Sequence, residues 1–244
     1  MRSGDVLTDA RTQRRLMPMS RLRPLTWAHA RPGVVRTDGS GNISSIETGA
    51  PVRLEQAAST SRPSVGNVRS RPTIRVNTNK LLQWDSYRYL DQCSLVIMYW
   101  QASGGGPAVK IEDVYATRFL AFDYSLFSLL FGSISSATQS QAVSNDTPYL
   151  ATIATNGSDG PFRLGGTSVT VSGGGFAGED AMLTVALSSM ASSPVDYFEI
   201  VAFDRNLNVE ELQLVEGIVA WSNGLPEVLN GQHRFRTRPP LIGD

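Results

Sequence analysis

The sequence is poor in cysteine, histidine and lysine, and the first two shortages each exclude a class of site. Cys93 is the only cysteine among 244 residues, which excludes an intrachain disulfide and a cysteine-rich metal centre. We expect it to be a small buried hydrophobic residue. His29 and His233 are the only histidines and neither lies near a serine or cysteine motif, so a catalytic triad has no basis. Only Lys80 and Lys110 of the 22 basic residues are lysines, and the others are arginines.

Long hydrophobic runs are also missing. Leu95–Trp100 is too short to span a membrane, and Phe119–Phe131 is interrupted by polar residues. The N-terminus has arginines but no apolar segment after them, so it does not read as a secretory signal. We therefore expect no membrane partner. A protein outside the cell would need another route, such as release with a virion at lysis.

The composition favours a soluble protein built from short strands. Hydrophobic residues make up 41% and charged residues 18% of the chain. The 22 glycines and 13 prolines suit many tight turns between strands. We see no internal repeat and no second domain.

The formal net charge of zero conceals a basic N-terminus. Residues 1–25 contain six arginines against Asp5 and Asp9 only, and no sustained apolar period. We expect an extended arm over residues 1–25 that lies on another protein, because arginine suits interfaces. The anchoring residues would be Arg11, Arg14, Arg15, Arg21 and Arg23. Nucleic acid is the weaker alternative, since no aromatic residues are interleaved with the arginines.

The C-terminal part contains a strand, a turn and one helix. Tyr197–Phe203 is apolar except for Glu199 and predicts a strand. Asn208 and Glu211 predict a capping box at the start of a helix over about residues 208–222. An apolar stripe at helical spacing includes Leu212, Leu214, Val215, Ile218, Val219 and Trp221, and we expect Glu216 to lie off it. Gly224 suits the left-handed position after the helix.

This unit resembles the C-terminal signature of concanavalin A-like lectin/glucanase domains of the laminin-G-like kind. The matching residues are Phe203, Asp204, Arg205, Leu207, Asn208, Glu211, Glu216, Trp221, Gly224 and Leu225. His233 and Pro239-Pro240 fit the tail that often follows. Asp38–Ile46, Ser61-Arg62-Pro63 and Arg71–Asn77 resemble earlier family segments. The resemblance implies a single domain over residues 26–225 with a C-terminal tail over 226–244. Such domains are common in bacteriophage virion proteins and in secreted bacterial proteins.

The remaining pattern is that of an all-β domain. Ser94–Ala102 is continuously apolar over six residues, as in a central strand covered on both faces. Hairpins are predicted over residues 119–131 and 147–164, and further strands over 168–172 and 182–187. Together with the resemblance, these segments predict a jelly-roll β-sandwich of the concanavalin A-like kind. One C-terminal amphipathic helix and the N-terminal arm complete it.

Glucan-cleaving family members carry paired catalytic carboxylates on one face of a strand. No such pair is apparent in this sequence. Glu112-Asp113 and Glu179-Asp180 are adjacent pairs, which would point to opposite faces of a strand. We interpret both as solvated turn residues. The sequence therefore predicts a protein that is not an enzyme.

Calcium is the metal that the resemblance to lectins suggests. The candidate ligands are Asp38, Asn42, Asn145, Asp146 and Asp159. Such residues in loops are usually turn formers, so we predict no metal and no cofactor.

Sugar binding requires exposed aromatic rings beside polar groups. Trp84, Asp85 and Tyr87 are the candidate carbohydrate-binding residues. The alternative is that Trp84 and Tyr87 pack over the edge of the sandwich. Trp27, Trp100 and Trp221 read as core residues.

The sequence thus suggests a structural protein of a phage virion, as capsid decoration or as a tail or fibre component. The arm would bind other virion proteins, in an assembly containing several copies of the chain. The sandwich would be displayed outward and bind host glycans. One alternative is a bacterial carbohydrate-binding module outside any virion. The other, a depolymerase, would need the carboxylates that the sequence does not align.

Overall fold

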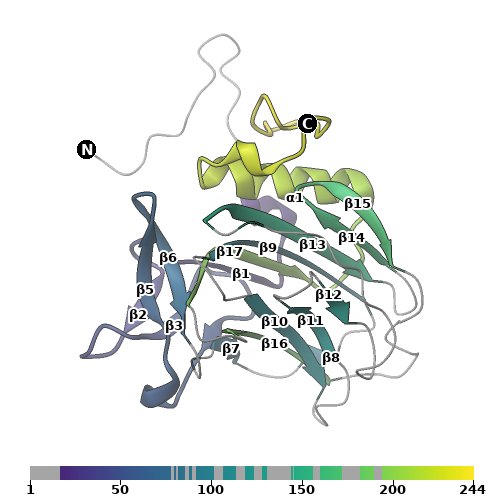
Figure 1. Cartoon of the computed structure of the whole chain (residues 1–244). Helices are drawn as coiled ribbons and strands as arrows, with labels where there is room; N and C mark the ends of the chain where they lie inside the picture. Colours follow the sequence, from purple (N-terminus) through teal and green to yellow (C-terminus); the bar gives the residue numbers. More distant parts are fainter. Residues whose placement is uncertain are drawn as a thin grey trace.

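The computed structural model describes residues 17–77, 80, 82–85, 88–89, 92–101, 107–113, 119–123, 128–130, 144, 146–155, 160–171, 182–189 and 194–244. These residues form two antiparallel sheets and one α-helix near the C-terminus (Figure 1). The mostly-β prediction is confirmed. The pairing order of the strands does not by itself establish the jelly-roll connectivity that the sequence predicted.

The first sheet has eight described strands, and its centre is the apolar pair β9 and β17. Its order is β15-β14-β13-β9-β17-β6-β5, and β1 also pairs with β17. The bounds are β1 Thr26–His29, β5 Ser64–Val68, β6 Arg71–Val76, β9 Cys93–Gln101, β13 Pro148–Thr155, β14 Gly160–Leu164, β15 Thr167–Val171 and β17 Val195–Phe203. The predicted central strand and the predicted 147–164 hairpin are therefore confirmed as β9 and as the β13–β14 pair.

The second sheet has nine described strands in the order β12-β11-β10-β16-β7-β4-β3-β2, with β8 paired to β16. The bounds are β2 Val35–Thr37, β3 Ile43–Ile46, β4 Leu54–Glu55, β7 Leu82–Trp84, β8 Arg88–Tyr89, β10 Pro107–Asp113, β11 Phe119–Asp123, β12 Ser128–Leu130 and β16 Met182–Ser189. The turn interpretation of Glu112-Asp113 is wrong, because both residues pair with β16 as part of β10. Glu179-Asp180 lies outside the described residues.

Two apolar layers hold the structure together, one between the sheets and one beneath the helix. Along β9, Leu95, Ile97 and Tyr99 belong to the layer between the sheets. Val96 and Met98 belong to the layer under the helix, as the alternation of a strand requires. Because both faces of β9 are covered, its sequence is continuously apolar.

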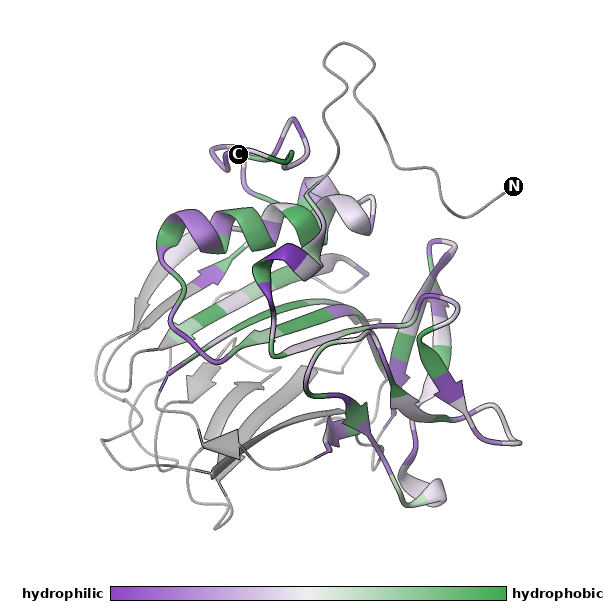
Figure 2. Cartoon of the chain, turned by 180° about the vertical axis from the view of Figure 1, so that it is seen from behind, coloured by the Kyte–Doolittle hydropathy of each residue, from purple (hydrophilic) through white to green (hydrophobic). Residues whose placement is uncertain are grey.

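The helix α1 spans Val209–Ser222 and lies across the outer face of the eight-stranded sheet (Figure 1). The predicted capping box is confirmed, since Asn208 accepts from the Glu211 backbone and the Glu211 carboxylate accepts from the Asn208 backbone. Gly224 follows in the left-handed conformation with φ +60°. Figure 2 shows apolar residues on the helix and on the strands beneath it.

Glu216 does not lie on the exposed side of the helix, so that prediction is wrong. Its side chain is fully buried and makes a bidentate ion pair with buried Arg163, at 2.8 and 3.0 Å. The His233 ring nitrogen Nε2 lies 3.0 Å from the same carboxylate. His233 comes from the C-terminal tail, so the tail helps to cover α1 at Glu216.

The last residues of the predicted arm belong to the folded body. Pro18 precedes the short helix η1, Met19–Leu22, whose Met19 is only 2% exposed in the layer under α1. The Met17 N–H donates to the Pro240 carbonyl at 3.1 Å, and the Leu25 N–H to the Ala202 carbonyl at 2.8 Å. The predicted boundary at residue 25 is therefore too late.

Two further short helices, η2 Ser59–Ser61 and η3 Pro226–Val228, lie in connecting segments. In the described part of the chain, no helix has the length and apolar character needed to cross a membrane.

Candidate functional site

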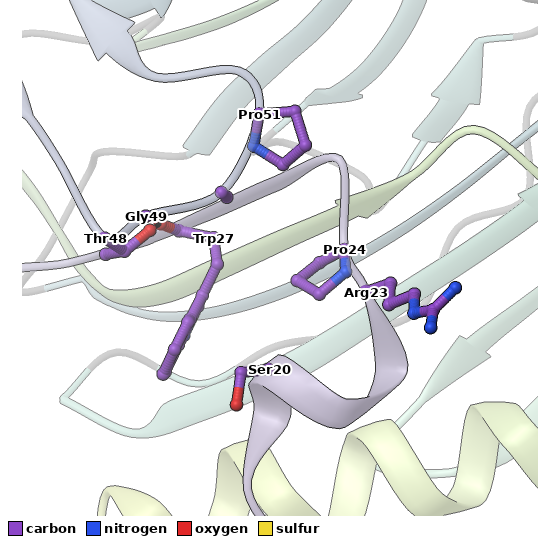
Figure 3. A pocket seen from close by; sticks show the side chains of 8 residues that line it. Ser20, Arg23, Pro24, Trp27, Thr48, Gly49 and Pro51 are labelled. Carbon is purple, nitrogen blue, oxygen red and sulfur yellow. Dashed lines mark hydrogen bonds between the residues drawn. The ribbon is translucent and has the colours of Figure 1, made fainter.

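A pocket of about 310 Å³ opens beside Trp27, where η1 leads into β1 (Figure 3). Its lining combines one aromatic ring, two proline rings, two hydroxyl side chains and one guanidinium. The lining residues are Ser20, Arg23, Pro24, Trp27, Thr48, Gly49, Ala50 and Pro51. The volume lies at the lower end of the range for small-molecule sites.

Local backbone geometry places these residues around the pocket. Arg23 turns the chain after η1 with φ +52°, and Pro24 then fixes the entry into β1. On the opposite side, Gly49 has φ +83° in the loop between β3 and β4. The Thr48 hydroxyl donates to the Trp27 carbonyl and ties this loop to β1.

The Trp27 ring is held in one orientation. Its indole Nε1 donates to the Glu199 carboxylate at 2.7 Å, and His29 packs against it edge-on with ring centroids 5.0 Å apart. Trp27 is only half-buried. Its ring therefore forms a fixed wall of the pocket.

A β-bulge in β17 brings Glu199 to this site. Tyr197 pairs with Tyr99 and Glu199 with Met98, so Phe198 is an extra residue in the ladder. Tyr197 faces the layer between the sheets, whereas Phe198 packs in the layer under the helix. Strict alternation would place Tyr197 and Glu199 on one face, and the bulge moves Glu199 to the helix side.

Four donors surround the fully buried Glu199 carboxylate. Besides Trp27, they are Arg31 at 2.9 Å, the Ser222 hydroxyl at 2.9 Å and the Asn223 amide at 2.6 Å. A buried charge requires such pairing and hydrogen bonding. Glu199 thus joins β1, β17 and the end of α1.

A second pocket, of about 430 Å³, is lined in part by residues that bond to this carboxylate. It is lined by Arg31, Pro32, Arg71, Pro72, Ser222 and Asn223. Arg31 is 37% exposed and is paired with Glu199. Arg71 donates to the Gly224 carbonyl at 3.0 Å and to the Arg69 carbonyl at 3.4 Å.

His29, beneath Trp27, is an uncharged group near neutral pH. Burial, together with the nearby Arg31 charge, lowers the pKa of His29 to about 3. Its Nδ1 accepts a 3.3 Å hydrogen bond from the Arg31 backbone, which also requires an unprotonated nitrogen. His29 therefore acts here as a packing partner of Trp27.

The predicted sugar-binding segment does not form this site. Trp84 is 3% exposed and packs between the two sheets, so it offers no face for stacking and the prediction is wrong for this residue. Asp85 is partly exposed, with a carboxylate oxygen 3.6 Å from Arg53. Tyr87 lies outside the described residues.

The predicted anchoring arginines divide into two groups. Arg11, Arg14 and Arg15 lie outside the described residues. Arg21 and Arg23 are exposed, and Arg23 also lines the pocket beside Trp27. The anchoring role stays a prediction.

The candidate calcium ligands at Asp38 and Asn42 form a turn. Asp38 accepts from the backbones of Ser40 and Asn42 and pairs with Arg62 at 3.1 Å. The Arg62 hydrogen bond lowers the pKa of Asp38. Asp146 takes a left-handed turn conformation with φ +58°, and Asn145 and Asp159 lie outside the described residues. Within the described ranges, no group of three His, Cys, Asp or Glu residues is arranged to hold a metal.

Known structures share this architecture. No family model matches the chain, and no curated protein matches it. Trypanosoma rangeli sialidase in complex with 2,3-difluorosialic acid is similar with a TM-score of 0.57 and 12% identity, over 82% of this chain and 33% of the sialidase. The binding domain of botulinum neurotoxin serotype G is similar with a TM-score of 0.52 and 11% identity, over 82% of this chain and 52% of that one.

These likenesses show the fold alone, a β-sandwich. The chain spans about a third of the sialidases and about half of the toxin binding domain. Neither group supports a phage origin.

The prediction that the protein is not an enzyme needs correction. It treated missing glucanase carboxylates as excluding catalysis, yet the similar structures include enzymes, the sialidases. The sandwich thus occurs within catalytic chains, and one absent motif excludes only one chemistry. At 12% identity, the likeness transfers no sialidase activity to this chain.

Trp27, Arg31 and Arg71 were not predicted as site residues. Trp27 was assigned to the core because a lone tryptophan beside a strand carries no sign of its exposure. The arginine-proline pairs Arg31-Pro32 and Arg71-Pro72 do not distinguish these positions, because Arg23-Pro24, Arg62-Pro63 and Arg238-Pro239 show the same pattern.

Proposed function

We propose that this protein binds glycans through the pocket beside Trp27. The observation that carries the proposal is the fixed, half-buried indole in the wall of an open pocket, with its N–H bonded to Glu199. Because the indole is already oriented, little conformational entropy is lost when a ring stacks on it.

The other lining groups suit a sugar. The apolar face of a pyranose packs on an aromatic ring, while its hydroxyls require donors and acceptors at the edge. Ser20 and Thr48 supply hydroxyl oxygens and Arg23 a guanidinium, and Pro24 and Pro51 extend the apolar wall. A purely apolar ligand would leave the Ser20 hydroxyl and the Arg23 guanidinium at the pocket without a polar partner from the ligand.

The structural likenesses support the same class of ligand. One similar structure is titled as a sialidase in complex with sialic acid, and another as the receptor binding domain of a botulinum neurotoxin. For the present chain, glycan binding rests on the pocket, and the fold agrees with it.

A glycan array tests the proposal with two matched variants. Ser20→Tyr places a large side chain at the pocket from an exposed position in η1. Ser59→Tyr makes the same change at an exposed position in η2. Binding that survives Ser59→Tyr and is lost with Ser20→Tyr supports the site. Equal binding by both variants, or no binding by the unaltered protein, contradicts it.

Placement in a phage virion is a separate proposal. It rests on the resemblance of the C-terminal unit and on the basic N-terminal segment, in which the arginines would bind other virion proteins. We propose that several copies display the sandwich outward from the particle. The alternative is a bacterial carbohydrate-binding module that occurs outside any particle.

Co-sedimentation with particles lacking this protein distinguishes the two. The full chain and a chain beginning at Met17 are compared, because residues from Met17 onward pack on the body. Sedimentation of the full chain alone supports anchoring through residues 1–16. Failure of both chains to sediment, with glycan binding intact, supports the free module.

A further inference from the structure

The pocket between Arg31 and Arg71 has a different chemistry from the pocket beside Trp27. Two guanidinium groups reach it from segments 40 positions apart, since Arg31 follows β1 and Arg71 begins β6. Ser222 and Asn223 at the end of α1 complete the lining with the two prolines.

The charges around this pocket do not cancel. Arg31 is paired with Glu199, whose two oxygens already accept from four donors. Arg71 bonds only to the carbonyls of Gly224 and Arg69, and within the described residues it has no carboxylate partner. The neighbouring Arg69 is balanced by Glu227, at 3.9 Å.

A carbonyl just past the end of α1 binds Arg71. The Gly224 carbonyl, two residues after the last residue of the helix, accepts from Arg71 Nη2 at 3.0 Å. This bond and the one from Nη1 to the Arg69 carbonyl orient the guanidinium. The approach to Gly224 is close, because a Cβ added there would lie 2.9 Å from Nη2. Arg71 is thus a positioned cation at the pocket, with its Nε unpaired in the described part of the chain.

We infer that this second pocket is a subsite for an acid group on the bound glycan. A planar guanidinium binds a carboxylate or sulfate through two parallel hydrogen bonds, and a net positive pocket favours an anion. Each pocket is lined by a residue that bonds to Glu199, since Trp27 in the first donates to Oε1 and Arg31 in the second donates to Oε2. The inference rests on the proposed glycan binding and names its ligand class as acidic glycans.

The test uses array pairs that differ only in the acid group. They are sialylated glycans and their desialylated forms, uronate oligosaccharides and their reduced forms, and sulfated glycans and their unsulfated forms. Arg71→Gln is the main variant, because Arg71, unlike Arg31, bonds to no buried charge. Arg36→Gln is the control with the same charge change, at an exposed position on β2.

We expect the unaltered protein to bind the acidic member of at least one pair about tenfold more tightly, the size of one charge-assisted hydrogen bond. Arg71→Gln should remove this preference while keeping affinity for the neutral member, and Arg36→Gln should keep both. Arg71→Lys, which retains the charge and a donor for the Gly224 carbonyl, should keep part of the preference. The kind of pair that responds identifies the acid as sialic, uronic or sulfate.

The contrary results are distinct. Equal binding of acidic and neutral members, or a preference that survives Arg71→Gln, overturns the acid subsite and leaves the Trp27 pocket standing. Binding of no array glycan overturns the proposed function and the subsite with it. Melting temperatures identify a variant that has unfolded. If Arg71→Gln is unfolded, Arg71→Lys tests the acid subsite instead. Loss of the preference for the acidic member in Arg71→Lys, despite the retained charge, counts against the subsite.

Discussion

Trp27 and Glu199 lie 172 positions apart and are joined by a 2.7 Å hydrogen bond from the indole Nε1 to the carboxylate Oε1. The bond connects the first strand of the domain to the last. It also makes the shape of the pocket depend on a buried charge, because Glu199 is fully enclosed. The Phe198 bulge is the backbone feature that brings the two side chains together.

Replacement of Glu199 should therefore affect stability strongly. Glu199→Ala leaves Arg31, Trp27 and Asn223 without their shared acceptor. We expect the free energy of unfolding to fall by about 3 kcal/mol, as for other broken buried pairs. Urea denaturation measures the change.

The control is Glu47→Ala, which removes an exposed carboxylate paired with Arg36 at 3.3 Å. An exposed pair contributes about 0–1 kcal/mol. If both substitutions cost the same small amount, the carboxylate does not hold the site together.

Substitutions of Arg163 and Glu216 should have strongly coupled effects on the free energy of unfolding. Arg163→Met leaves the buried Glu216 carboxylate with His233 as its one remaining polar partner in the described chain. We expect this single change to destabilise by about 3 kcal/mol. The double variant with Glu216→Leu should lose less than the sum of the two single changes, because no unpaired charge remains. A double-mutant cycle in urea measures the coupling, and simple additivity would contradict it.

The predicted pattern of buried and exposed residues differs most from the structure where single polar residues interrupt apolar segments. Glu199 is the one polar residue of its predicted strand and Glu216 is predicted to lie off the apolar stripe of the helix, yet both are fully buried. Their partners come from segments far along the chain, Trp27 and Arg163 among them, and no local pattern identifies such partners.

Structural features that depend only on neighbouring residues could be predicted from the sequence. The capping box of Asn208 and Glu211 and the left-handed Gly224 depend on neighbouring residues alone, and the structure has them as predicted. The bulge at Phe198 could not be predicted, because an extra residue in a ladder is visible only once Tyr99 and Met98 are paired.

His29 should make stability depend on pH. Its pKa is about 3 in the folded protein, against 6.5 for the ordinary side chain. Between these values the unfolded chain binds a proton that the native state does not, so the free energy of unfolding falls as the pH falls below 6.5. The slope approaches about 1.4 kcal/mol per pH unit.

Comparison with His29→Gln isolates this contribution from other titrating groups. Urea denaturation at pH 7.5, 6.5, 5.5 and 4.5 should show the unaltered protein losing stability faster than the variant. Two parallel pH profiles would mean that His29 takes up its proton in the folded state as readily as in the unfolded state.

The N-terminal boundary gives a further prediction. A chain beginning at Met17 should be as stable as the full chain, whereas one beginning at Trp27 lacks the buried Met19 and the Leu25 backbone bonds. Loss of the Met19 side chain alone should lower the free energy of unfolding by about 2 kcal/mol. Thermal unfolding of the chains beginning at Met17 and at Trp27, and of Met19→Ala, measures this. Equal stability of the two shortened chains would mean that residues 17–25 belong to the arm and not to the folded body.

Calorimetric titration of the tightest-binding array glycan into the unaltered protein and Trp27→Ala tests the central claim most directly. Trp27→Phe, which keeps a ring and loses the N–H, is included to separate stacking from the bond to Glu199. We predict at least about a tenfold loss of affinity for Trp27→Ala, the scale of a lost aromatic contact, and a smaller loss for Trp27→Phe. Unchanged affinity in a folded Trp27→Ala would show that glycans do not bind at this pocket.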